Sequence, residues 1–142
     1  MQHVYLFFCG CESWSLTEAS SEKLNCIART FYRIICGIKQ SESHKTNEQI
    51  YAIVNQIPIT EKLRKRQLEF IGHCLRMPPE EPANIYALYQ SRVREKNKYI
   101  KQISKFITYD SRLKLTTAEI SKYASDKRSW SSLITESKKP GR

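Results

Sequence analysis

Apolar residues recur along most of this sequence at spacings of three and four, which is the period of an α-helix rather than of a strand. The pattern predicts helices over residues 17–36, 60–77, 99–108 and 118–134, and a short one that opens at Thr46 and ends before Pro58. Residues 4–9 are apolar, aromatic and β-branched, which is typical of a short strand ending at Gly10. Residues 83–89 indicate a short strand or a packed loop. We therefore expect a mainly α fold of about five helices, with at most one short N-terminal strand.

The predicted helix over residues 60–77 is central to the chain. Winding it at about 100° per residue gathers five apolar side chains on one side: Leu63, Phe70, Ile71, Cys74 and Leu75. The opposite side collects polar side chains: Lys62, Lys65, Arg66, Glu69, His73 and Arg76. Gln67 falls inside the apolar arc, and Arg64 falls near its edge. Thr60 is expected to cap the start of the helix, and Pro78 forces its end.

This amphipathic pattern has two interpretations. A basic stripe on a helix is often only a solvated face. It is also the pattern of a helix that faces nucleic acid.

The letters of the same stretch favour the second interpretation. Residues 64–77 read RKRQLEFIGHCLRM. This run resembles the motif R-x-R-x-L-x-x-x-G-H-x-x-R-M, which lies near the C-terminal end of reverse transcriptases from LINE-type (non-long-terminal-repeat) retrotransposons. The residues at matching positions are Arg64, Arg66, Leu68, Gly72, His73, Arg76 and Met77.

Three further stretches resemble the same family in the same order along the chain. Residues 10–17, GCESWSLT, resemble Y-G-C/A-E-x-W-x-L-T, with Cys9 where tyrosine is usual. Residues 46–50, TNEQI, resemble T-N-E-E-I, and residues 124–130, ASDKRSW, resemble A-x-D-R-x-x-W. The resemblance implies structural roles for eight residues, Gly72 permitting close approach of another element: Gly10, Glu12, Trp14, Gly72, His73, Met77, Asp126 and Trp130.

The family's corresponding region follows the polymerase thumb and is thought to help grip template RNA or target DNA. The resemblance therefore implies that this chain is a C-terminal fragment of such an endonuclease and reverse transcriptase, without the catalytic palm, the fingers or the endonuclease. We expect one truncated domain over residues 1–136, followed by a disordered basic tail over residues 137–142.

The formal charge of +10 agrees with a polyanionic partner, because most of the excess lies after residue 59. Residues 1–59 are neutral overall, whereas residues 60–106 carry eleven Lys/Arg against five Asp/Glu and residues 107–142 carry eight against four. The family motif nominates Arg64, Arg66 and Arg76 as nucleic-acid ligands. Charge and helix face nominate Lys62, Lys65, Arg92, Arg94, Lys98, Lys101 and Lys105. Reversing the charge of Lys62, Lys65, Arg66 and Arg76 should abolish binding.

Three tyrosines lie near the basic clusters: Tyr86, Tyr89 and Tyr99. Tyrosines in these positions can stack on unpaired bases. The simpler interpretation is that they pack against the fold with the hydroxyl at the surface.

The sequence offers little for catalysis. A nucleotidyl transferase needs carboxylates that hold divalent metals, but the two aspartates, Asp110 and Asp126, lie in separate segments. His73 and Cys74 are neighbours, so on a helix they point about 100° apart and cannot act as a base and nucleophile pair. The cysteine spacing is not that of a zinc site, and no glycine-rich phosphate loop is present. We expect no enzyme activity, no cofactor and no metal.

The five cysteines are odd in number and form no disulfide framework, so we expect reduced thiols in an intracellular protein, in the nucleus or the cytoplasm. No stretch is apolar enough to span a membrane. The main prediction is nonspecific binding of RNA or DNA by a reverse-transcriptase-derived fragment. One alternative is a protein-interaction module whose apolar faces contact the missing polymerase body or a second copy. Another is a decayed gene-model fragment without function.

Overall fold

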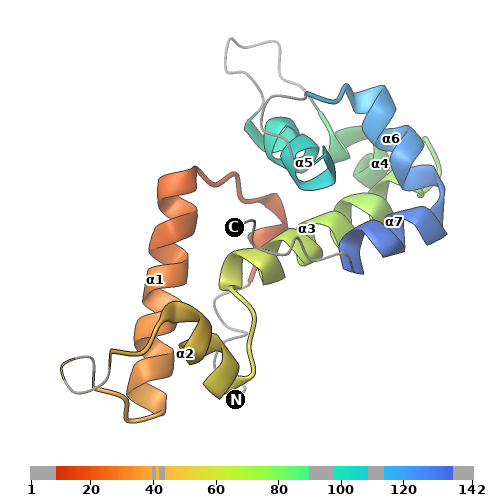
Figure 1. The fold of residues 1–142 in the computed structure, drawn as a ribbon. Helices are drawn as coiled ribbons and strands as arrows, with labels where there is room; N and C mark the ends of the chain where they lie inside the picture. The colour runs from red at the N-terminus through yellow and green to blue at the C-terminus, as the bar shows by residue number, and fades with distance from the viewer. Residues whose placement is uncertain (1–8, 40, 42–43, 90–97, 109–113, 136–142) are drawn as a thin grey trace. The chain divides into compact units, whose positions relative to one another are not determined.

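The computed structural model describes residues 9–39, 41, 44–89, 98–108 and 114–135. These residues form a mainly α-helical fold without a strand, which confirms the expected class (Figure 1). The elements are a short 3-10 helix η2 (Cys11–Ser13) and the α-helices α1 (Glu18–Ile35), α2 (Asn47–Val54), α3 (Ile59–Leu75), α4 (Pro82–Ala87), α5 (Lys98–Thr108), α6 (Thr117–Ser125) and α7 (Lys127–Thr135). Residues 4–8 of the expected strand lie outside the described ranges.

The described residues hold seven α-helices rather than five, for two reasons. Residues 82–87 form helix α4 instead of the expected strand or loop, and Pro82 at its first turn has the backbone angle that a helix start requires. The expected last helix is broken at Asp126, whose backbone is extended (φ −86°, ψ 102°). The Asp126 carboxylate accepts a hydrogen bond from Arg128 N at 3.0 Å and another from Ser129 Oγ, so it caps a new helix instead of continuing the old one.

Capping side chains set most of the other helix starts. The expected capping boxes at Thr46 with Gln49 and at Thr116 with Glu119 are both formed, which confirms those two predictions. The expected cap of α3 is wrong. Helix α3 begins one residue before Thr60, and Thr60 N donates to Asn25 Oδ1 of α1 at 3.3 Å.

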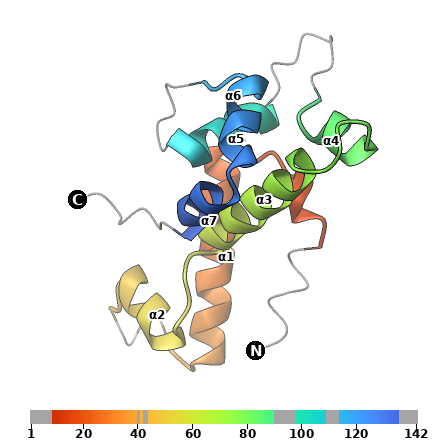
Figure 2. The same ribbon diagram turned by 90° about the vertical axis from the view of Figure 1, so that its right-hand side faces the viewer.

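The chain divides into two compact units. The smaller unit spans Leu16–Lys62, and the larger unit combines Met1–Ser15 with Leu63–Arg142. In the smaller unit, α1 and α2 lie side by side (Figure 2). They bury Ala28 and Tyr32 of α1 with Ile50 and Val54 of α2.

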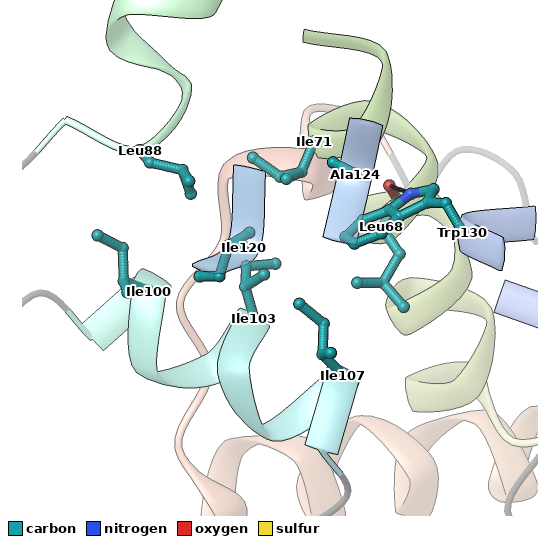
Figure 3. Packing of buried hydrophobic residues seen from close by; sticks show 9 residues of the cluster. All are labelled: Leu68, Ile71, Leu88, Ile100, Ile103, Ile107, Ile120, Ala124 and Trp130. Atoms are coloured by element: carbon teal, nitrogen blue, oxygen red, sulfur yellow. Dashed lines mark hydrogen bonds between the residues drawn. The ribbon is translucent and has the colours of Figure 1, made fainter. Parts of the chain in front are cut away.

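The larger unit has one main apolar core, drawn in Figure 3. It is built from the buried side chains Leu68, Ile71, Leu88, Ile100, Ile103, Ile107, Ile120, Ala124 and Trp130. These come from α3, α5, α6 and α7, with Leu88 directly after α4. Sequence positions more than 50 residues apart therefore share this core.

The buried side of α3 differs from the predicted apolar side. Leu63, Ile71 and Cys74 are buried as expected, but Phe70 is 44% exposed. Gln67 and Arg64 are both buried, although neither is apolar. The helix is therefore rotated toward its polar side relative to the expected orientation, because these two side chains find hydrogen-bond partners inside the unit.

Candidate nucleic-acid interface

Gly72 of α3 lies directly beneath the indole of Trp130 of α7. A Cβ atom added at Gly72 would be closest to Trp130 Nε1, and would lie 2.7 Å from Cδ1 and 2.8 Å from Cε2. Trp130 Nε1 donates to the Leu68 carbonyl oxygen at 2.8 Å, as the dashed line in Figure 3 shows. Glycine is thus the residue that lets α7 approach α3 this closely.

Two motif arginines, Arg64 in α3 and Arg76 directly after it, bind the last turns of other helices. The Arg64 guanidinium, which is only 4% exposed, donates from Nη1 and Nη2 to the Leu133 carbonyl of α7, each at 3.4 Å. Arg76 Nη1 donates to the Ala124 carbonyl of α6 at 3.0 Å. Carbonyls in the last turn of a helix lack intrahelical partners and carry partial negative charge, so a cation there is favourable. The expected phosphate role of Arg64 is therefore wrong, because its guanidinium is buried and donates to the Leu133 carbonyl.

The third motif arginine contacts the N-terminal motif. Arg66 Nη2 lies 3.1 Å from Glu12 Oε1, and the Arg66 side chain is 42% exposed. Arg66 therefore remains accessible to a phosphate, but a phosphate would compete with Glu12. Reversing the charge of Arg66 or Arg76 would thus disturb tertiary contacts.

Gln67 is a structural residue that the sequence pattern did not assign. Its Nε2 donates to the Cys11 carbonyl at 2.7 Å and to the Trp14 carbonyl at 2.8 Å, and its Oε1 accepts from Gln102 Nε2 at 2.6 Å. These bonds hold the segment around η2 to α3 and α5. The signal in the sequence was a glutamine inside an apolar arc, which is unfavourable unless partners satisfy it.

The remaining predicted cations differ in accessibility. Lys65 of α3 is half-buried, and Lys62, which belongs to the smaller unit, is half-buried with its Nζ donating to Gln56 Oε1. Burial lowers the pKa of Lys62. Lys98 and Lys101 of α5 are exposed and Lys105 is half-buried. Arg92 and Arg94 lie outside the described residues.

Among the described residues of the larger unit, α5 to α7 and the segment before α6 carry most of the exposed positive charge. Residues 98–108 and 114–135 hold seven Lys/Arg against two carboxylates, Glu119 and Asp126. Both carboxylates cap helices, and hydrogen bonds from those caps lower the pKa of each. Four exposed cations here were not nominated from the sequence, although the charge of residues 107–142 indicated them: Lys114, Lys122, Lys127 and Arg128.

The larger unit also has an open groove of about 590 Å³ between α3 and α4. Its lining includes four aromatic side chains: Phe70, Tyr86, Tyr89 and Tyr99. His73 lines the groove and is exposed, whereas Cys74 is buried, and burial raises the pKa of its thiol. A thiol in that state is a poor nucleophile.

The described residues contain no group of three or more His, Cys, Asp or Glu side chains arranged to hold a metal ion. None of the helices in the described ranges is both long and apolar enough to cross a bilayer. Comparisons with protein-family models, with curated proteins and with solved structures find no match to this chain.

Proposed function

We propose that this chain derives from the C-terminal part of a LINE-type reverse transcriptase and binds RNA or DNA without sequence specificity. The tertiary contacts between motif residues support the derivation. Arg66 pairs with Glu12, Trp130 lies on Gly72, and Arg76 binds the carbonyl of the alanine that opens the last motif. Residues that match three separate motifs are therefore the ones that hold one another in place.

The observation that carries the binding role is the exposed charge of α5 to α7. Lys98, Lys101 and Lys105 follow one another at spacings of three and four, so they share one side of α5. Seven Lys/Arg against two carboxylates give the described residues of α5 to α7 and the segment before α6 an excess of five positive charges. Both carboxylates are engaged in helix caps. Such charge attracts phosphates through counterion release, which depends on salt and not on base sequence.

The proposal includes no catalytic step. The sequence contains two aspartates, and Asp126 is engaged in capping α7. Binding is therefore the whole activity that we assign.

The test compares two double charge reversals by fluorescence anisotropy. Labelled single-stranded RNA and duplex DNA are titrated across a salt series with wild-type protein, with Lys98→Glu/Lys101→Glu, and with Lys23→Glu/Lys45→Glu. All four lysines are exposed, and the control pair lies in the smaller unit. Both variants change the net charge by the same amount, so the control separates a local contact from a general loss of charge.

We expect the affinity of wild-type protein to fall linearly in log salt. The α5 variant should reduce the slope by about two, which is roughly one per lost phosphate contact, while the control keeps the wild-type slope. Equal slopes for both variants would refute a role for α5. No binding by folded wild-type protein at low salt would refute the proposed function.

A specific observation favours the protein-interaction alternative. Leu24, Ile27, Phe31 and Ile34 of α1 follow one another at spacings of three, four and three, which is the seam spacing of a coiled coil. The side chains of Ile27, Phe31 and Ile34 are 49%, 48% and 70% exposed. A second copy of the chain, pairing through α1, would cover this stripe.

Sedimentation velocity across a concentration series tests the self-pairing. A dimer that Phe31→Ser/Ile34→Ser abolishes would support it. A monomer at every concentration would exclude it.

A further inference from the structure

We infer that the groove between α3 and α4 receives unpaired bases of a single-stranded nucleic acid. This inference rests on the proposed function and refines it, because it adds a preference for single strands to an affinity that charge alone would give equally to duplexes. The notable feature is aromatic surface: Tyr86 is 64% exposed and Tyr89 is 59% exposed, and both line the groove with the half-exposed Phe70.

The groove walls are held by the fold. Tyr99 OH donates to the Glu12 carbonyl at 2.6 Å, which keeps this ring in place at the α5 side. Across the groove, Asn84 Nδ2 donates to the Leu75 and Met77 carbonyls at 3.2 Å and 2.9 Å, which ties α4 to the end of α3. The walls are therefore positioned before any ligand arrives.

The exposed rings are arranged to accept a flat partner. Tyr86 and Tyr89 pack edge to face, with ring centroids 5.7 Å apart and planes at 61°, so one ring leaves a face open beside the other. Base stacking on aromatic side chains tolerates any sequence because every base has a π face. The volume of about 590 Å³ is in the range of small-molecule sites, so it has room for a nucleobase.

Polar groups in the lining suit the edge of a base. His73 and Ser13 are both exposed and both line the groove. Imidazole and hydroxyl groups can form hydrogen bonds with the edges of different bases. This matches a site that binds bases without reading a sequence.

The charges around the groove indicate that it contributes to binding by stacking on bases rather than by contacting phosphates. Glu69, Glu80 and Glu81 are exposed and belong to α3 and to the segment between α3 and α4, so the groove itself does not favour phosphates. Of the motif arginines on these segments, Arg66 pairs with Glu12 and Arg76 binds the Ala124 carbonyl. Seven Lys/Arg lie instead on α5 to α7 and the segment before α6, beginning at Lys98 beside Tyr99 of the groove wall. A polyanion attracted by α5 would thus meet the aromatic rings with its bases.

The test removes aromatic rings without changing charge. Tyr86→Ala and Tyr89→Ala are compared with Tyr123→Ala, whose parent side chain is 52% exposed on α6 and is not part of the groove lining. The probes are a labelled single-stranded oligouridine and a labelled DNA duplex of the same length, titrated at several salt concentrations. Circular dichroism confirms that each variant is folded, and the exposure of the parent tyrosines predicts that it will be.

Each groove variant should lose about 5- to 100-fold in affinity for the single strand, with an unchanged salt slope and an unchanged affinity for the duplex. Tyr123→Ala should match wild type on both probes. An equal affinity of the groove variants and Tyr123→Ala for the single strand would overturn the inference, while the salt slope of Lys98→Glu/Lys101→Glu would still test the proposed function. Equal losses on single strand and duplex would also overturn it, because a duplex presents no unpaired base.

Discussion

Replacing Gly72 by alanine is the sharpest test of how α3 and α7 pack. Alanine favours a helix over glycine by about 1 kcal/mol, so propensity alone predicts a more stable protein. The structure predicts the reverse. The new Cβ would occupy space that the Trp130 ring already fills, with Cδ1 at 2.7 Å and Cε2 at 2.8 Å. The indole is rigid and only 2% exposed, so it cannot swing aside into solvent.

Two costs oppose the gain in helix propensity. Overpacking a dense core costs about 1–3 kcal/mol. Displacing the ring also breaks the 2.8 Å bond from Trp130 Nε1 to the Leu68 carbonyl, and a buried donor left without its partner costs about 1–3 kcal/mol. After the gain from propensity, the net destabilisation of Gly72→Ala is about 1–5 kcal/mol.

Urea unfolding followed by tryptophan fluorescence measures the stability of the larger unit, because Trp14 and Trp130 both belong to that unit. His73→Ala is the matched control, since His73 is the exposed neighbour of Gly72 and its loss should change stability by less than about 0.5 kcal/mol. In a Trp130→Ala background, followed by circular dichroism, Gly72→Ala should become neutral or stabilising. A Gly72→Ala protein as stable as wild type would refute the packing argument.

Two further predictions follow from buried or capping charges. Arg64→Met should lower the free energy of unfolding by about 1–3 kcal/mol, because the Leu133 carbonyl loses its donors. Because Arg64 is buried, the same variant should leave the salt slope of nucleic-acid binding unchanged. A reduced slope in anisotropy titrations would contradict that buried position. Hydrogen bonds from Ser129 and Arg128 lower the pKa of Asp126 below its ordinary value of 3.8, so its contribution to stability is complete above that pH and is lost as the pH falls through the lower folded value. Asp126→Asn keeps a capping side chain but does not titrate. The urea midpoint of this variant should therefore fall less between pH 5 and pH 2 than the urea midpoint of wild type. Parallel pH profiles of the two midpoints would count against a stabilising role of the Asp126 carboxylate.

The candidate site was only partly visible in the sequence. Lys98, Lys101 and Lys105 could be nominated together from the sequence, because a single helix face depends on spacing alone. Arg64 was misassigned because its exposure depends on a carbonyl 69 residues away. The aromatic groove combines residues of α3, of α4 and of α5, so its tyrosines could be nominated from the sequence but not grouped.

Local features of the fold were determined by the sequence itself. The capping boxes at Thr46 and Thr116 and the helical periods of α1, α3 and α5 depend on residues within four positions of one another. The mainly α class follows from these periods, because each helix satisfies its own backbone hydrogen bonds.

Only the tertiary structure decided which side of each helix is buried and where two of the helices begin. Gln67 is buried because carbonyls from residues 11 and 14 accept its protons. Helix α3 starts one residue before Thr60, whose backbone N–H donates to Asn25 of α1. The apolar stripe of α1 stays exposed because α2 covers a different side of that helix. A hydrophobic pattern states which side chains avoid water. Partners that are distant in the sequence decide which polar side chains can be buried without cost. A buried polar group needs a hydrogen bond, and here the local sequence does not supply it.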